Sequence, residues 1–372
     1  MASITTTISH LERENEVPKV FDFNSLQAEG KVPNEFIWSS KDLLETSKEE
    51  LNVPIIDLEP IFKGDNVALG AAAEIVRETC MKHGFFLVTN HRVDQNLINA
   101  TYQEFVSLFK LPLDRKLGAI GIPWGYSAAH ASRYSTNLPW KETFTFQYKH
   151  YDQSPTQIVD FFTSSFGDDH QHAGLVCQKY CEAMKELSGV ILELLATSLG
   201  VDRLHYKKFF EDAETMMRCN SYPPCSEVNA GTLGTGPHCD PTSVTILFQD
   251  QVGGLEVFVD DKWLSVRPQP NTFVINIGDT FKALTNGLYK SCLHRVLTNK
   301  EKDRKTLAFF LCPKGDKIVR APENILGREE PRNYPDFTWS QFFEYTQRKH
   351  RADPNTLPDF VSWLRSSNTS SV

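Results

Sequence analysis

Apolar residues recur at helical spacing in several segments along the chain. We predict helices over residues 69–83, 94–108, 176–199, 338–350 and 357–364. The third of these has the clearest apolar stripe, which consists of Met184, Leu187, Ile191, Leu194, Leu195 and Leu199. Gly200 follows the stripe where a helix C-cap belongs. A stripe of this kind is typical of a helix that packs in the core, so we give it no part in the chemistry.

The pattern changes at Thr215, after which short β-rich runs alternate with turn residues. We predict strands over residues 216–222, 243–249, 255–259, 263–266, 273–277, 294–297 and 306–311. Turn residues such as Gly253-Gly254 separate these runs. Two earlier strands are predicted over residues 53–58 and 84–88. So many short strands within about a hundred residues are typical of a double-sheet jelly roll.

Together these elements predict an α+β fold with a double-stranded β-helix (jelly roll) core flanked by N-terminal and C-terminal helices. Residues 1–50 are polar with scattered prolines, and we expect a partly disordered arm that wraps the outside. Residues 51–214 are predicted to form an N-terminal α/β region, and residues 215–315 the jelly-roll core. Residues 316–372 should form a C-terminal helical segment that packs on the barrel.

The composition is that of an ordinary soluble globular protein. Of the 372 residues, 40% are hydrophobic and 23% are charged. The formal net charge is −8 and no basic stripe is visible, so we expect neither a nucleic-acid partner nor a membrane partner. No apolar stretch approaches the length of a membrane span. The eight cysteines are spread along the chain and no apolar leader precedes them, so we expect reduced thiols and a cytoplasmic location. We also expect a monomer.

The tripeptide His238-Cys239-Asp240 places two metal-binding side chains at positions i and i+2. On an extended segment such side chains point to the same face. His294 lies in a later predicted strand, which sheet pairing can bring opposite. Two imidazoles and one carboxylate on one side of a metal leave its other positions open, as in non-haem Fe(II) oxygenases. We therefore predict that His238, Asp240 and His294 are the catalytic metal ligands of Fe(II), and that a keto acid and O2 take the open positions.

Arg304 and Thr306 repeat the i, i+2 spacing ten residues beyond His294. A guanidinium beside a hydroxyl, both facing the interior of a barrel, can bind a carboxylate through parallel hydrogen bonds. A dicarboxylic co-substrate such as 2-oxoglutarate supplies that anion. Taken alone, His238 could be a hydrogen-bonded core histidine and Arg304 a surface charge. The whole set in this order favours a metal and co-substrate site.

These residues carry a family resemblance. The segment Asn220 to Cys225 (NSYPPC), followed by the metal and arginine motifs, resembles the plant soluble 2-oxoglutarate/Fe(II)-dependent dioxygenases. Residues 83–91 (HGFFLVTNH) resemble the N-terminal region of that family, and the match covers roughly residues 50–350. The resemblance implies that Tyr222 helps Arg304 and Thr306 to hold the 2-oxoglutarate carboxylate. It also implies that ascorbate supports activity.

A finer resemblance lies in residues 138–143 (LPWKET), which are similar to a signature of the gibberellin 20-oxidases. Residues 233–242 and 286–295 also fit that subfamily. The implied substrates are twenty-carbon gibberellin precursors, which are diterpenoid carboxylic acids. The implied reaction oxidises the C-20 methyl stepwise to an alcohol and an aldehyde, after which that carbon is lost and a nineteen-carbon lactone remains. Each step releases succinate and CO2.

A carboxylate substrate entering an acidic protein needs a local cation. Arg133 and Lys141 are the candidates, and Trp140 is the third predicted substrate-binding residue. The competing interpretation of residues 138–143 is a packed loop with Trp140 as an anchor and Lys141-Glu142 as a solvated pair.

Three positions depart from the wider family. Ser221 replaces a common Tyr, Arg92 replaces a common Gly, and Thr306 replaces the commoner Ser but keeps the hydroxyl.

Other functions stay open at this point. A related dioxygenase could act on another gibberellin position, a flavonoid or an alkaloid. A non-catalytic metal-binding jelly roll is a second alternative, although Arg304 and Tyr222 would then have no purpose. A zinc hydrolase with the same three ligands would need a positioned general base, and the sequence assigns none.

Overall fold

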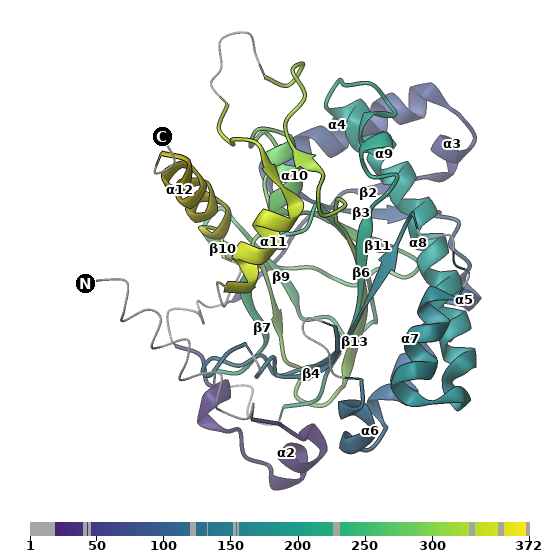
Figure 1. The fold of residues 1–372 in the computed structure, drawn as a ribbon, viewed down its shortest axis with the longest axis vertical. Coiled ribbons are helices and arrows are strands. Elements are labelled where there is room, and N and C mark those ends of the chain that lie inside the picture. The colour runs from purple at the N-terminus through teal and green to yellow at the C-terminus, as the bar shows by residue number, and fades with distance from the viewer. Residues whose placement is uncertain are drawn as a thin grey trace.

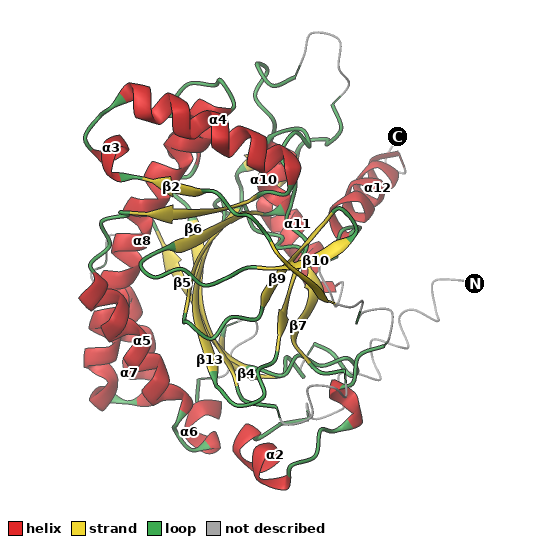
Figure 2. Cartoon of the chain, turned by 180° about the vertical axis from the view of Figure 1, so that it is seen from behind, coloured by secondary structure: helices red, strands yellow, loops and turns green. Residues whose placement is uncertain are grey.

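Two β-sheets face each other in the middle of the molecule, and most helices lie along the outer side of the larger sheet (Figure 1, Figure 2). The computed structural model describes residues 19–39, 43, 46–119, 124–131, 133–151, 154, 156–225, 231–326, 332–348 and 353–369. The predicted jelly-roll core flanked by helices is confirmed.

The larger sheet has eight strands and contributes one wall of the core. In spatial order they are β2 (Ile55–Asp57), β3 (Phe85–Thr89), β11 (Phe273–Ile277), β8 (Val244–Gln249), β13 (Arg304–Leu311), β6 (Glu214–Tyr222), β5 (Glu142–Lys149) and β4 (Gly125–Ala128). All neighbours are antiparallel except β2 and β3. Strands from the N-terminal part of the chain and from the predicted core therefore share one sheet. The boundary between these two regions stays a prediction.

The smaller sheet faces it with five strands. Their order is β1 (Thr46–Glu50), β10 (Lys262–Ser265), β9 (Leu255–Val259), β12 (His294–Leu297) and β7 (Leu233–His238). Strand β12 lies between β9 and β7, antiparallel to both. This arrangement brings His294 directly opposite His238.

Strand β5 was not among the predicted strands. Its residues alternate between polar side chains and the aromatic set Phe144, Phe146 and Tyr148, which is buried in the main core. Along its whole length β5 pairs with β6. The LPWKET segment, whose alternative interpretation was a packed loop, thus leads into a strand in which six of the eight residues are buried.

Three long helices cover the outer face of the larger sheet and match the predictions closely. They are α4 (Asn66–Lys82), α5 (Gln95–Phe109) and α8 (Gln171–Ser198), and the unpredicted α7 (Gln157–Phe166) packs beside α8. The stripe on α8 is buried, as expected. After α8, Gly200 has a φ of +68°, which is left-handed. The amides of Gly200 and Val201 donate hydrogen bonds to the carbonyl oxygens of Thr197 and Ala196, respectively. This is a Schellman ending.

The described part of the predicted N-terminal arm contains buried aromatic residues. Within residues 19–39, the side chains of Phe21, Phe23, Phe36 and Trp38 are buried. They include α2 (Phe23–Glu29) and the short 3-10 helix η1 (Asn34–Phe36). Phe21, Phe23 and Phe36 belong to a separate hydrophobic cluster that includes Trp140. The polar composition of the arm does not predict this cluster. Residues 1–18 lie outside the described residues.

The C-terminal segment contains both predicted helices, α11 (Trp339–Arg348) and α12 (Thr356–Thr369), preceded by the short pair β14 (Ile318–Val319) and β15 (Phe337–Thr338). The remaining short elements are α3 (Glu59–Phe62), α6 (Leu113–Leu117), η2 (Asp168–His170), α9 (His205–Phe209) and α10 (Asp279–Leu284). Within the described part of the chain, no helix is both long and apolar enough to cross a membrane.

Candidate metal centre and carboxylate site

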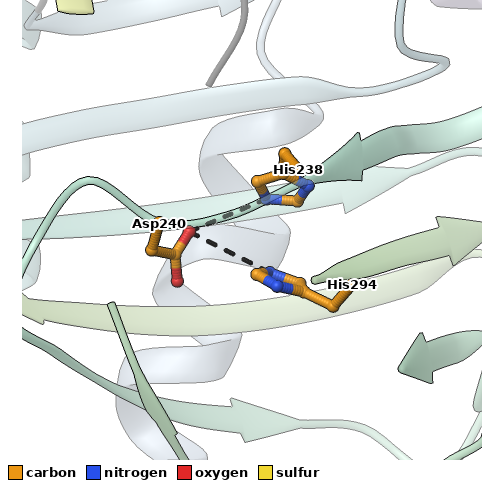
Figure 3. Close-up of side chains that lie close together, drawn as sticks. All are labelled: His238, Asp240 and His294. Carbon is orange, nitrogen blue, oxygen red and sulfur yellow. Dashed lines mark ion pairs between the residues drawn. The ribbon is translucent and has the colours of Figure 1, made fainter. Parts of the chain in front are cut away.

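Three metal-binding side chains converge between the two sheets (Figure 3). His238 ends β7, Asp240 follows it by two residues, and His294 begins β12. Oδ1 of Asp240 lies 3.7 Å from Nε2 of His238 and 3.9 Å from Nε2 of His294. The candidate ligand atoms all lie within 4.8 Å of one another, so one ion can reach all three. The structure brings together the predicted set.

Both imidazoles are held in the same way. Nδ1 of His238 lies 2.9 Å from the carbonyl oxygen of Gly236, and Nδ1 of His294 lies 3.0 Å from that of Cys292. When Nδ1–H donates to this carbonyl, the lone pair of Nε2 is left for a metal. Burial lowers the pKa of His238 to about 3, and the neighbouring His294 adds to the shift. Neutral imidazoles are the form that binds a metal.

Asp240 is fixed through its other oxygen. Oδ2 accepts hydrogen bonds from Thr245 Oγ1 at 2.6 Å and from Asn276 Nδ2 at 2.9 Å. Burial acts to raise the pKa of Asp240, but the two imidazoles and these two donors outweigh it and lower the pKa. The carboxylate therefore stays ionised, with Oδ1 directed at the imidazoles.

Two glycines allow the backbone around the ligands to pack closely. A Cβ on Gly236 would lie 1.8 Å from the ring of Trp38, which packs against β7 from the N-terminal arm. A Cβ on Gly278 would lie 2.1 Å from the carbonyl oxygen of Thr242, beside Asp240. Larger residues at either position would displace the ligand-bearing segments.

Arg304 has the environment of a carboxylate-binding residue. Its side chain is 1% exposed and lies over the ring of Tyr222, with Cζ 5.1 Å from the ring centroid. Nη2 donates to Gln249 Oε1 at 3.1 Å, while the buried Nε and Nη1 have no hydrogen-bond partner within the described structure. These buried N–H groups without partners leave the guanidinium able to donate hydrogen bonds to a carboxylate. The alternative of a surface charge at this position is excluded.

Thr306 lies beside this guanidinium on the same face of β13. Its hydroxyl oxygen accepts a hydrogen bond from Asn220 Nδ2 at 2.9 Å, so its own hydrogen can be donated to an anion. Asn220 was not predicted as a site residue, although it opens the NSYPPC motif. Arg304, Thr306 and Tyr222 all line the same cavity as the metal ligands.

The floor of that cavity is a ladder of directly paired residues from β6 and β13. The pairs are Tyr222 with Arg304, Asn220 with Thr306, Arg218 with Ala308, and Met216 with Phe310. All eight line the cavity. Arg218 was missed at the sequence level. The signal that could have found it is the alternation of Met216, Arg218, Asn220 and Tyr222 along one strand face.

The three predicted substrate-binding residues have different outcomes. Arg133 and Lys141 line the cavity. Trp140 does not line it: the indole is 2% exposed, packs edge-on against Phe23 and Phe36, and donates from Nε1 to the carbonyl oxygen of Pro223. Its prediction as a substrate contact is wrong, because the N-terminal arm and the NSYPPC segment occupy the space around it.

The alternative of a solvated Lys141-Glu142 pair is also wrong, since both side chains are buried. They point to different neighbours. Glu142 accepts hydrogen bonds of 2.5 Å from Lys116 and Tyr126. Nζ of Lys141 lies 5.9 Å from the ring centroid of Tyr222, on the cavity side.

The departures at positions 92 and 221 lie away from the cavity. Arg92 has φ +60° and pairs with the Glu59 carboxylate at the surface. Ser221 faces away from Tyr222 on β6 and donates to Asp303. Neither side chain lines the cavity.

Comparison with known proteins matches both halves of the chain. Residues 213–313 match the family model of the 2OG-Fe(II) oxygenase superfamily, and residues 53–163 match that of the non-haem dioxygenase in morphine synthesis N-terminal region. The chain is 46% identical to gibberellin 20 oxidase 2 of Arabidopsis thaliana, with 99% of each chain covered. It is 49% identical to gibberellin 20 oxidase 2 of Oryza sativa subsp. japonica, with 91% of this chain and 87% of the relative covered.

Solved structures agree with these matches. The crystal structure of JOX2 in complex with 2OG, Fe and JA aligns with a TM-score of 0.78 and 28% identity, covering 93% of this chain and 99% of that one. The crystal structure of the dioxygenase for auxin oxidation in rice aligns with a TM-score of 0.69 and 28% identity, covering 82% and 99%. The chain thus has the same fold as these solved oxygenases.

Proposed function

Because the chain belongs to the gibberellin 20-oxidases of the 2OG-Fe(II) oxygenase superfamily, we propose that it oxidises C-20 of twenty-carbon gibberellin precursors to give nineteen-carbon gibberellins. The observation that carries the proposal is the identity of 46% over the whole length of a gibberellin 20 oxidase. A non-catalytic relic is disfavoured, because Arg304 keeps two buried N–H groups for an anion.

The protein uses Fe(II) and 2-oxoglutarate, as its family does. We assign His238, Asp240 and His294 as the iron ligands, and Arg304, Thr306 and Tyr222 as the residues that hold the far carboxylate of 2-oxoglutarate. The bound metal and co-substrate supply the chemistry: each turnover consumes one O2 and one 2-oxoglutarate, releases succinate and CO2, and oxidises the substrate by two electrons.

The protein's own residues position the reactants. The backbone carbonyls of Gly236 and Cys292 hold the imidazoles in one tautomer. Thr245 and Asn276 hold the carboxylate of Asp240. The side chain of Arg304 is buried, so its charge acts on a bound carboxylate with little screening by solvent.

Arg133 and Lys141 are the proposed contacts for a carboxylate of the gibberellin. Burial lowers the pKa of Lys141 to about 7, and Arg218, Arg304 and Arg133 add to the shift. An incoming carboxylate would favour the protonated form of Lys141, so substrate binding and protonation support each other. Arg133 also donates from Nη2 to the carbonyl oxygen of Thr346, which joins this end of the cavity to α11.

Three further assignments complete the proposal. We propose that the protein is a cytoplasmic monomer, which its net charge of −8 and its eight buried cysteines support. We keep the domain boundaries at residues 50, 214 and 315 as proposals. Strand β6 begins within one residue of the second boundary.

The proposal is tested with purified protein, Fe(II), ascorbate and 2-oxoglutarate. The substrates offered are twenty-carbon gibberellin precursors, a flavonoid and an alkaloid, and products are identified by mass. We expect alcohol, aldehyde and nineteen-carbon products from the gibberellins alone, with succinate formed in step. Turnover of the flavonoid or alkaloid in place of every gibberellin would contradict the proposal.

A further inference from the structure

Arg218 lies on the cavity floor, and it is neither a metal ligand nor one of the residues assigned to 2-oxoglutarate. It lies on the same face of β6 as Asn220 and Tyr222, and it lines the cavity. Tyr222 pairs directly with Arg304. Since Arg218 precedes Tyr222 by four residues, the backbone positions of the two arginines are about 13 Å apart along the strand, at about 3.3 Å per residue. Arg218 is therefore a second basic position on the same floor.

The guanidinium of Arg218 is held in place by its neighbours on both sides. Thr145 is its direct partner on β5, is buried, and accepts a hydrogen bond from Arg218 Nε at 3.0 Å. On the other side its partner on β13 is Ala308, whose small side chain leaves the adjoining space open. Arg218 Cζ lies 5.5 Å from the ring centroid of Phe310, which is next along β13 on this face. These contacts fix the base of the guanidinium and leave its outer N–H groups to the cavity.

The charge of the cavity indicates what those N–H groups bind. Among the described residues that line it, Asp240 is the one carboxylate, whereas Arg133, Lys141, Arg218 and Arg304 are basic. The net positive charge of Fe(II) bound with Asp240 would be cancelled by the net negative charge of 2-oxoglutarate bound with Arg304. The three remaining cations would then have no counter-ion. No ion pair joins Arg218 to a carboxylate within the described part of the chain. Lys141 is buried, whereas Arg133 and Arg218 are half-buried, and cations gathered in one cavity in this way attract an anion.

We propose that Arg218 binds a carboxylate of the gibberellin precursor and is the residue that orients the substrate over the metal, with Thr145 as its positioning residue. This inference rests on the proposed function and deepens it. In this arrangement β6 and β13 carry the two anion positions, Arg304 for the co-substrate and Arg218 for the substrate, at different rungs of one ladder. Lys141, whose Nζ lies 5.9 Å from the ring centroid of Tyr222, lines the same cavity and assists the substrate position.

The test measures binding to the full chain loaded anaerobically with Fe(II) and 2-oxoglutarate. The probes are a twenty-carbon gibberellin precursor and its methyl esters, made at each carboxylate in turn. For Arg218→Gln we expect the Kd of the free acid to rise about 30-fold or more, as for other truncated buried charge pairs. The ester of the carboxylate that Arg218 binds should change little, so that the preference for acid over ester shrinks. Arg218→Lys should fall between parent and Arg218→Gln, because it keeps the charge without the fork.

Two further variants sharpen the test. Thr145→Val removes the acceptor but not the charge, so the acid-over-ester preference should fall by less than in Arg218→Gln. Arg267→Gln is the matched control, since Arg267 is an exposed arginine paired with Glu50. It should bind acid and ester as the parent does. The Kd for 2-oxoglutarate should stay at the parental value in every one of these variants.

Three results would overturn the inference. The first is a parental acid-over-ester preference in Arg218→Gln, and the second is a loss of 2-oxoglutarate affinity instead of substrate affinity. The third needs no variant: if no methyl ester binds the parent more weakly than the free acid, no cation in the cavity recognises a substrate carboxylate. These outcomes differ from failure of the proposed function, in which the parent would neither bind nor oxidise any gibberellin precursor.

Discussion

The two ends of the cavity are built on opposite principles. At the metal end, each ligand has a partner for the atom that does not face the metal: Gly236 and Cys292 for the imidazoles, Thr245 and Asn276 for the carboxylate. The other end is defined here by the three cations Arg133, Lys141 and Arg218, and the one carboxylate among the described lining residues, Asp240, belongs to the metal ligands. We infer that the first end is preorganised for a small, constant partner, and that the second is completed by its ligand.

The largest effect should follow from removing a metal ligand. Loss of a hydrogen bond that supports a metal ligand typically lowers metal affinity roughly 10- to 100-fold. We expect His294→Ala, which removes a ligand itself, to lower iron affinity by more than this and to abolish turnover. The fold should survive, as judged by circular dichroism. His172→Ala, an exposed histidine on α8, is the control. Zn(II) should occupy the parental site without supporting oxidation. Normal iron binding and turnover in His294→Ala would show that the metal end is assigned wrongly.

A smaller loss should follow when a ligand is kept but its support is removed. Thr245→Val takes one donor from Asp240, and Asn276 remains. In the parent, the hydrogen bond from Thr245 stabilises the ionised form of Asp240, so its removal should raise the pKa of Asp240. Iron affinity should fall roughly 10- to 100-fold. Thr215→Val removes an equally buried hydroxyl that bonds to the carbonyl oxygen of Tyr148. If both variants bind iron alike, the support around Asp240 has no effect on the metal.

At the substrate end, Lys141→Ala should have a more modest effect. We expect the KM for the gibberellin to rise about tenfold, or about 1.4 kcal/mol, because the two arginines still attract the carboxylate. The KM for 2-oxoglutarate should not change. Lys262→Ala is the control, since this exposed lysine on β10 pairs with Glu49 at the surface. An unchanged gibberellin constant in Lys141→Ala would mean that Lys141 serves packing alone.

The sequence predicted those elements and residue pairs that follow from a regular spacing of residues within one segment. The i, i+2 spacing correctly placed Arg304 and Thr306 on one face of β13, and it brought His238, at the end of β7, together with Asp240, which follows that strand. Most strands of the core and the stripe on α8 followed from their own periods, although β7 was not among the predicted strands. Strand β5 was not predicted, although it carries an equally regular alternation of polar and aromatic residues.

What the sequence did not predict depends on partners distant along the chain. Trp140 is a packing residue because Phe23, Phe36 and Pro223 surround it. Arg218 has its place because the register of β5, β6 and β13 puts Thr145 on one side and Ala308 on the other. No spacing within one segment encodes such a register, since it is set by the pairing of whole strands.

The central claim is that Arg304 marks the co-substrate end of the cavity, and one measurement tests it most directly. The affinity for 2-oxoglutarate is read from the visible charge-transfer band of the anaerobic Fe(II) protein. Removing one member of a buried charge pair costs about 2–5 kcal/mol, so Arg304→Ala should bind 2-oxoglutarate roughly 30- to several-thousand-fold more weakly. Arg304→Lys should lie between Arg304→Ala and the parent, and Thr306→Val should lose less than Arg304→Ala. All three should bind iron as the parent does. Near-parental affinity for 2-oxoglutarate in Arg304→Ala would contradict the account and leave a metal-binding jelly roll without its co-substrate.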